Sequence, residues 1–206
     1  MRKIILASAS PSRKRLLESV GISPEIIVSG VDEEIPEITS LTPSEMVMAL
    51  AILKAHTVNN ASRIEDALII GCDSTFEFEG KNLGKPRSRE KAIARAKSMS
   101  GKSGLLHTGH CIIDTSAGYE VSDISTSSVF FVEMTDAEIE NYVDSGEPLN
   151  VAGGFTLDGL SAPFIGRIEG DPSGIIGLSL PTMRKMILNL GLQWSDIAST
   201  PKAAIV

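Results

Sequence analysis

The chain has 206 residues, of which 42% are hydrophobic and 22% charged, a composition typical of a soluble globular protein and not of a disordered chain. The formal net charge of −7 argues against a nucleic-acid coat or a binder of acidic membranes, because neither partner would attract it. We interpret Cys72 and Cys111, which share no metal-ligand spacing, as reduced core residues, with a disulfide as the alternative. No apolar stretch approaches a membrane span and the first residues lack a signal-peptide pattern, so we expect a cytoplasmic protein.

The first predicted elements are a strand over residues 4–7, a polar turn, and a helix over about residues 11–20. The unpaired N–H groups at a helix start attract anions, and phosphate is the obvious candidate. Four side chains add donors for phosphate oxygens there: Ser8, Ser10, Ser12 and Arg13. The alternative is a plain N-capped helix with a solvated basic first turn.

A short β-branched run over residues 25–29 predicts a second strand, and Asp32, Glu33 and Glu34 follow just past its end. Three carboxylates in a row are usually solvated, but after a strand of an α/β protein they can also bind Mg²⁺ or Mn²⁺. The predicted helix that follows is capped by Thr42, has Pro43 in its first turn and carries Lys54 late in its course. Taken alone, Lys54 is typical of a surface lysine near the carboxyl end of a helix.

The continuous apolar run over residues 67–72 predicts a central strand that is covered on both faces and ends directly at Asp73. Ligands of open α/β sheets gather at the carboxyl ends of strands, so we expect Asp73 at a ligand site. The alternative is an aspartate that caps a turn through its own backbone.

The sequence Gly84-Lys85-Pro86 presents Lys85 from a defined turn, because glycine allows close approach of the backbone and proline stiffens the exit. This arrangement favours phosphate binding by Lys85. The helix predicted over residues 89–99, capped by Ser88, is interpreted as scaffold.

The second half of the chain is predicted to add antiparallel strands and two helices to the first half. His107 and His110 are three residues apart on a strand and so point to opposite faces, which argues against a metal site. The predicted elements are strands over residues 107–114, 119–121, 125–132 and 164–168, helices over 135–143 and 181–190, a turn over 170–178 and an irregular tail over 194–206.

A series of short motifs runs through nearly the whole chain. They are Leu6-Ala7-Ser8-Ala9-Ser10-Pro11 with Arg13, Asp32-Glu33, Lys54-Ala55, Gly71-Cys72-Asp73-Ser74, Gly84-Lys85-Pro86, Ser100-Gly101 with Thr108-Gly109, Ala152-Gly153-Gly154, and Gly170-Asp171 with Gly177-Leu178. In order and spacing these motifs resemble the Maf nucleotide pyrophosphatases.

The resemblance implies an α/β fold of the Maf/ITPase-like kind, with a mixed twisted sheet, flanking helices and two lobes around a central cleft. It implies a single domain over residues 1–206 with no separable linker. The implied activity is hydrolysis of nucleoside triphosphates, noncanonical or modified ones above all, to the monophosphate and pyrophosphate with Mg²⁺ or Mn²⁺. Such a house-cleaning enzyme would be cytoplasmic and often a homodimer, with neither nucleic acid nor a membrane as partner.

Carried over by position, the resemblance also implies roles for particular residues. Asp73 corresponds to the proton acceptor, and Glu33 is the second carboxylate on the side of the metal. Lys54, Lys85 and Arg13 correspond to phosphate clamps, the two lysines within the catalytic machinery. Side chains that would line the cradle for the substrate are Ser8, Ser10, Ser12 and Asp158.

Three positions depart from the pattern of many members. Those members have a second arginine where Ser12 stands, a histidine where Gly104 stands and a glutamine where Asp158 stands. The departures bear on the choice between pyrimidine nucleotides and 7-methyl-GTP, and an acidic Asp158 favours a base with donor edges or a positively charged ring.

Two other functions stay open on the sequence alone. The first is a phosphatase or a kinase-like phosphoryl transferase, distinguished by orthophosphate instead of pyrophosphate as the product. A nucleotide-binding regulator of cell division would bind nucleotides with little catalysis. The product of the reaction distinguishes the first alternative, and retained binding without hydrolysis distinguishes the second.

Overall fold

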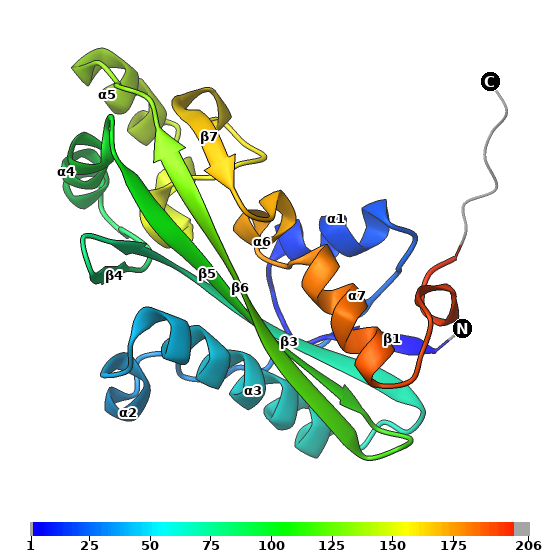
Figure 1. Cartoon of the computed structure of the whole chain (residues 1–206). Coiled ribbons are helices and arrows are strands. Elements are labelled where there is room, and N and C mark those ends of the chain that lie inside the picture. Colours follow the sequence, from blue (N-terminus) through cyan, green and yellow to red (C-terminus); the bar gives the residue numbers. More distant parts are fainter. Residues whose placement is uncertain (1, 200–206) are drawn as a thin grey trace, which may run out of the picture.

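The structure, a computed structural model, describes residues 2–199. Its centre is a seven-stranded mixed sheet in the order β2-β1-β3-β5-β6-β7, with β4 paired to the far part of β3 (Figure 1). β1 runs parallel to β2 and β3, and the other neighbours are antiparallel. The strands are β1 (Lys3–Leu6), β2 (Glu25–Ile26), β3 (Ala67–Phe78), β4 (Lys81–Leu83), β5 (Ser103–Asp114), β6 (Tyr119–Phe131) and β7 (Ile165–Glu169).

Helices cover both faces of this sheet. The long helix α3 lies against one face, α1, α6 and α7 lie against the other, and α4 and α5 pack together at the far end (Figure 1). None of the helices within residues 2–199 has the length and apolar character needed to cross a membrane. The α-helices are α1 (Pro11–Ser19), α2 (Pro36–Thr39), α3 (Pro43–Ser62), α4 (Arg89–Met99), α5 (Asp136–Asp144), α6 (Pro172–Ile176) and α7 (Leu180–Asn189).

Two glycines of the sheet allow α3 to approach the strands closely. A Cβ on Gly71 would lie 2.1 Å from the carbonyl oxygen of Ala51, and one on Gly109 would lie 2.4 Å from that of Val47. Both distances are far shorter than van der Waals contact, so only glycine fits between the sheet and this helix. The close approach brings Lys54, on the same helix, against strand β3.

Strand β3 is longer than the sequence predicts, which corrects the expected position of Asp73. The strand does not end before Asp73 but continues to Phe78. The strand that ends is its parallel neighbour β1, whose last residue, Leu6, pairs with Ile70, while β4 joins the same edge only from Phe76 onward. The edge of β3 between these two points is open, and the carboxyl ends of the parallel strands β1 and β2 lead toward it.

Most other predicted elements are confirmed. α1 begins at Pro11, and Thr42 and Thr135 cap the starts of α3 and α5. Cys72 and Cys111 are buried and free, so the alternative of a disulfide between them is wrong.

Four predictions need correction or lie partly outside the described residues. The strands predicted over 119–121 and 125–132 are one continuous strand, β6, and the strand predicted over 25–29 is only two residues long. The predicted turn over 170–178 contains the short helix α6, which begins because the carboxylate of Asp171 accepts two backbone N–H groups. The tail has one 3₁₀ turn at Trp194–Asp196, and residues 200–206 lie outside the described part.

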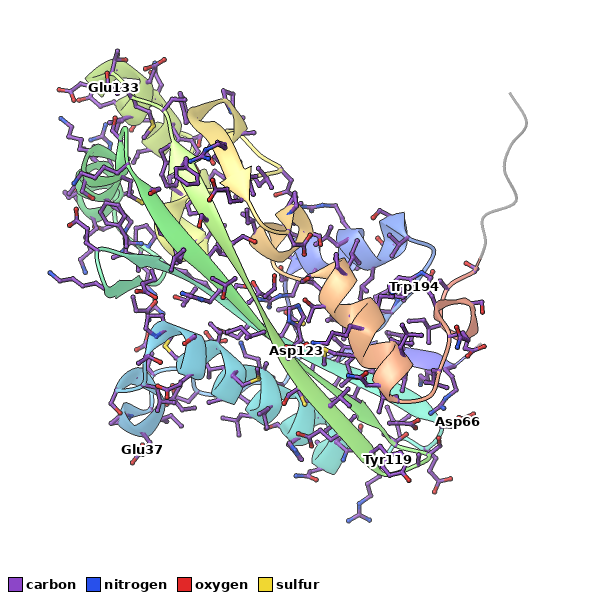
Figure 2. All side chains as sticks on the ribbon, in the orientation of Figure 1. Glu37, Asp66, Tyr119, Asp123, Glu133 and Trp194 are labelled. Atoms are coloured by element: carbon purple, nitrogen blue, oxygen red, sulfur yellow. The ribbon has the colours of Figure 1, made fainter. Side chains whose placement is uncertain are left out.

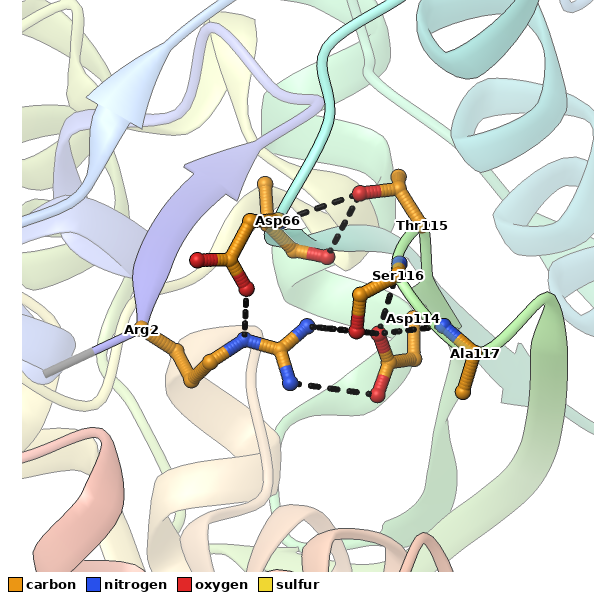
Figure 3. A network of polar contacts seen from close by, with 7 residues as sticks. Arg2, Asp66, Asp114, Thr115, Ser116 and Ala117 are labelled. Carbon is orange, nitrogen blue, oxygen red and sulfur yellow. Dashed lines mark hydrogen bonds and ion pairs between the residues drawn. The ribbon is translucent and has the colours of Figure 1, made fainter.

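Asp66 and Tyr119 lie at the end of the sheet opposite to the end near Glu133 (Figure 2). Arg2 connects the segments that meet at this end. Arg2 donates to Asp114 at 2.5 Å and to the Ser116 hydroxyl at 2.9 Å, and its Nε lies 3.0 Å from Asp66 Oδ1 (Figure 3). Burial raises the pKa of Asp114, but its hydrogen bonds from Arg2 and the following turn outweigh that effect and lower the pKa to about 2. These contacts hold the start of β1 in register beside β3.

Candidate active site

A cavity of about 720 Å³ lies beside the open edge of β3, beyond the end of β1. Both halves of the chain contribute to its wall, since the segments after β1 and β2 face the loop before α4 and the segment over residues 150–158. All of the residues that the sequence assigned to a site line this one cavity: Ser8, Ser10, Ser12, Arg13, Glu33, Lys54, Asp73, Lys85 and Asp158.

Lys54 stands at the centre of the cavity wall. Its Nζ lies 2.6 Å from Asp73 Oδ1 and 2.5 Å from Glu33 Oε1. Only 8% of the Lys54 side chain is exposed, so the interpretation as a surface lysine is wrong. Asp73 lies in the middle of a strand with Lys54 as its hydrogen-bond partner, which also excludes the alternative of a turn-capping aspartate. The two carboxylates supply contacts that offset the hydration lost when the Lys54 side chain is buried.

Asp73 and Glu33 share Lys54 but differ in their acidity. Burial raises the pKa of Asp73, and the opposing charges of Lys54 and Arg13 do not cancel that effect. Burial also raises the pKa of the more exposed Glu33, but there the hydrogen bond from Lys54 and the neighbouring positive charges prevail, so its pKa is lowered. The cavity therefore holds one carboxylate that accepts a proton more readily than an ordinary aspartate and one that stays ionised.

Arg13 is buried on the other side of the open edge and is fixed by three hydrogen bonds. It donates to the carbonyl oxygen of Gly177 at 2.7 Å and to the hydroxyls of Ser8 and Ser74 at 2.9 and 3.0 Å. Ser74 is in turn 2.9 Å from the hydroxyl of Thr108. Because a guanidinium carries five N–H donors, these bonds position the group and leave donors for a ligand.

The polar turn after β1 forms the start of α1 as predicted. The Ser10 hydroxyl caps this helix by accepting the N–H of Arg13 at 3.5 Å, and the Ser8 hydroxyl accepts the N–H of Ser10 at 3.2 Å. Both serines line the cavity, so the amino end of α1 faces it. The positive end of the helix dipole therefore adds to the field of Arg13.

Ser12 and Asp158 lie at the rim and are joined by a third residue. Arg15 donates to the Ser12 hydroxyl at 3.0 Å and to Asp158 Oδ2 at 3.3 Å. The Arg15 side chain is 63% exposed, and this link connects α1 to the segment that follows residue 154. The sequence singled out Ser12 and Asp158 but not Arg15, since nothing local pairs positions so far apart along the chain.

Lys85 projects from the loop between β4 and α4. Its side chain is exposed, whereas the neighbouring Pro86 is buried and anchors the loop. The charge of Lys85 contributes to the low pKa of Glu33, behind the effects of burial and of Lys54. The same loop carries Arg87, which also lines the cavity and which the sequence reasoning missed.

Ser74 and Thr108 were likewise missed as parts of the site, although both stand in the quoted motifs. They pair directly across β3 and β5, and their hydroxyls connect Arg13 to the carbonyl oxygen of Gly174. Each hydroxyl residue stands in a polar stretch at one end of a predicted strand, but strand register is needed to see that the two meet.

Glu33 and Asp73 are the carboxylates that could hold a divalent cation. Among residues 2–199 no group of three or more His, Cys, Asp or Glu side chains gathers as a closed metal site. Carboxylate oxygens are nevertheless the donors that Mg²⁺ prefers, and proteins commonly bind it through one or two carboxylates together with oxygens of the substrate. The two residues therefore fit a cation that is completed by an anionic ligand.

The fold and the cavity place the chain among α/β proteins whose ligand site lies at the carboxyl ends of parallel strands. Comparison with protein families matches residues 3–190 to the family described as Maf-like protein. The chain belongs to this family.

Curated relatives support the same assignment. A protein of Streptomyces coelicolor, named nucleoside triphosphate pyrophosphatase, is 52% identical over 190 residues, which cover 92% of this chain and 91% of the relative. A protein of Thermosynechococcus vestitus with the same name is 46% identical over 197 residues, covering 96% of this chain and 98% of the relative.

Proposed function

We propose that this protein is a nucleoside triphosphate pyrophosphatase, a hydrolase that cleaves between the α and β phosphates and releases the monophosphate and pyrophosphate. One observation carries the proposal: Arg13, Lys54 and Lys85 line the same cavity as the buried carboxylate of Asp73. Cations opposite a proton-accepting group are what hydrolysis of a polyphosphate requires, and relatives with about half of their residues identical bear this name.

The cationic residues would neutralise the substrate. A nucleoside triphosphate carries about four negative charges, which repel an attacking water and must be compensated. In the proposed complex Arg13 and Lys85 bind phosphate oxygens from two sides of the cavity, and the hydroxyls of Ser8 and Ser10 donate to the same oxygens. Lys54 compensates for charge that develops beside Asp73.

Asp73 is proposed as the general base. The attacking water forms its bond to phosphorus, its proton moves to a carboxylate oxygen of Asp73, and the bridging oxygen leaves with pyrophosphate. The raised pKa of Asp73 makes its carboxylate a stronger proton acceptor than an ordinary aspartate. Lys54, 2.6 Å away, opposes the effect of burial on that pKa and holds the carboxylate in place.

Mg²⁺ or Mn²⁺ is the proposed cofactor, and Glu33 and Asp73 would hold it. A bound divalent cation supplies further neutralisation of the phosphate charge and lowers the pKa of water. Glu33 suits this role because its low pKa keeps it ionised at neutral pH.

The remaining proposals concern the biological setting. We propose a single-domain cytoplasmic enzyme, acting as a homodimer, that removes noncanonical or modified nucleotides without a nucleic-acid partner. Ser12 and Asp158 would face the nucleoside, because both line the cavity and Arg15 joins them there.

A panel of triphosphates tests the function. Pyrophosphate release from dTTP, UTP, 5-methyl-CTP and 7-methyl-GTP is measured with and without Mg²⁺. We expect metal-dependent release of pyrophosphate from at least one of them. Orthophosphate as the product would identify a phosphatase, and nucleotide binding without hydrolysis would identify a regulator.

A further inference from the structure

Two basic side chains flank a buried proline in the loop that enters the cavity. Pro86 packs so close to Gly154 that a Cβ on that glycine would lie 3.1 Å from the proline ring, and the backbone N–H of Arg87 donates to the carbonyl oxygen of Leu149 at 3.1 Å. The loop is thus fixed to the 147–154 segment, and both Lys85 and Arg87 line the cavity.

Arg87 is paired with a carboxylate that also lines the cavity. Its Nη2 lies 2.7 Å from Glu34 Oε1, and the two side chains are 68% and 70% exposed. An ion pair so open to water adds little to the stability of a fold. Arg87 precedes α4 and Glu34 follows β2, so the pair joins two separate segments of the cavity wall.

Two adjacent carboxylates of the acidic segment after β2 each pair with a cation of the cavity. Glu33 pairs with Lys54 and Glu34 pairs with Arg87. The turn is held by Asp32, whose carboxylate accepts the N–H of Glu34 at 2.9 Å. In the structure, Glu33 and Glu34 are therefore paired with the cations that a polyphosphate would need to bind.

A phosphate group competes well for such an arginine. The planar guanidinium donates two parallel N–H groups to phosphate oxygens, and a terminal phosphate carries more charge than a single carboxylate. Exchange of Glu34 for phosphate breaks only a solvent-exposed pair, which costs little.

We propose that Arg87 binds the terminal phosphates of the substrate, next to Lys85, and that it exchanges Glu34 for them when the nucleotide enters. This inference rests on the proposed pyrophosphatase function. It assigns a further substrate-binding residue and gives Glu34 the role of a competing internal anion.

The proposal predicts opposite effects for the two partners of one ion pair. Arg87→Ala removes a phosphate contact and raises KM for the triphosphate about tenfold, with kcat little changed. Glu34→Gln frees Arg87 and lowers KM by about threefold. A purely structural pair would instead give changes in the same direction, because either substitution breaks it.

Two further readouts locate the contact. Arg87→Ala should weaken inhibition by inorganic pyrophosphate about tenfold but leave inhibition by the nucleoside monophosphate unchanged, since the monophosphate lacks the terminal phosphates. In the double variant, Glu34→Gln should no longer lower KM, because the arginine that it frees is absent.

Arg89→Ala is the matched control. Arg89 lies two residues after Arg87 and is not among the residues that line the cavity. It forms an exposed ion pair with Asp144 at 2.7 Å. Its KM should equal that of the wild type.

An unchanged KM in Arg87→Ala, or equal gains from Glu34→Gln with and without Arg87, would overturn the inference while leaving the pyrophosphatase function intact. Should the wild type release no pyrophosphate, the proposed function fails instead. In that case, direct titration of inorganic pyrophosphate still tests the role of Arg87. Binding should be weaker in Arg87→Ala and tighter in Glu34→Gln than in the wild type, and equal affinities would exclude the role.

Discussion

The centre and the rim of the cavity use the same kinds of charged residues in opposite environments. At the centre, Lys54 and Asp73 are about nine-tenths buried, with exposed fractions of 8% and 11%. At the rim, Arg87 and Glu34 are about two-thirds exposed. A buried pair is strongly coupled because water does not screen it, whereas an exposed pair breaks and forms at little expense. The comparison predicts that chemistry depends on the centre and that affinity and choice of nucleotide depend on the rim.

The largest effect is expected for Asp73→Asn, which removes the proposed proton acceptor at the centre. Loss of a positioned general base lowers kcat by about 10²–10⁴. Binding of the triphosphate should remain detectable by titration, since the cations are still present. Asp123→Asn, which removes a carboxylate outside the cavity that is paired with Lys185, is the control. Full turnover of Asp73→Asn would exclude Asp73 from the mechanism.

Lys54→Met breaks the buried pair and leaves Asp73 without its partner. Removal of one member of a buried ion pair destabilises a protein by about 3 kcal/mol, measurable by urea unfolding at pH 7. Lys102→Met, which breaks the exposed pair with Glu79, should leave the unfolding midpoint unchanged. Equal effects of the two substitutions would contradict the contrast between buried and exposed ion pairs.

The buried side chain of His110 makes the stability of the folded protein depend on pH. It is 1% exposed, it accepts the backbone N–H of Ser179 at 2.8 Å, and burial lowers its pKa from 6.5 to about 4. Between these values the unfolded chain binds a proton that the folded protein does not, so stability is full above about pH 6.5 and falls as the pH approaches 4.

The expected loss over that range is about 3 kcal/mol in the free energy of unfolding. It is measured by urea unfolding at a series of pH values. His110→Gln, whose side-chain oxygen can still accept the N–H of Ser179, should show a shallower slope. The same slope in both proteins would assign the pH dependence to other groups.

Lys85→Ala tests an exposed cation at the rim. Loss of one charge-assisted phosphate contact should raise KM about tenfold and leave kcat largely unchanged. Lys81→Ala, on the neighbouring strand β4 and outside the cavity-lining residues, serves as control. If KM and kcat of Lys85→Ala equal those of the wild type, Lys85 is a bystander.

The smallest effect is expected at the link between Arg15 and Asp158. Asp158→Gln should change the ratio of kcat/KM between two nucleotides by about threefold, because it alters one polar group beside the proposed nucleoside position. Since Arg15 is mostly exposed, the unfolding midpoint should not move. A ratio identical to that of the wild type across the triphosphate panel would remove Asp158 from base selection.

The sequence predicted those elements whose signals are local. α1, α3 and α5 begin at the capping residues Ser10, Thr42 and Thr135, and the start of each helix was correct. The helix α6 was missed because it has only five residues and looks like a turn when its cap at Asp171 is not weighed.

The site depended on contacts that no local pattern reveals. Asp73 and Ser74 looked like the polar end of an apolar strand, yet the strand continues because Phe76 is buried against the rings of Phe78, Phe131 and Phe155. Lysine alone is typical of a surface, and the burial of Lys54 follows from carboxylates on two other elements. The resemblance of the motifs predicted that these residues belong to one site. They meet because the edge of β3 between β1 and β4 is open.

The central claim is that the cavity beside the open edge of β3 hydrolyses the α–β phosphoanhydride bond. ³¹P NMR of a reaction with the preferred triphosphate measures this most directly, because it resolves every phosphorus product. The account predicts equal amounts of nucleoside monophosphate and pyrophosphate with the wild type, and formation of both at least about a hundredfold slower with Asp73→Asn. Nucleoside diphosphate with orthophosphate, or equal turnover by both proteins, would contradict it.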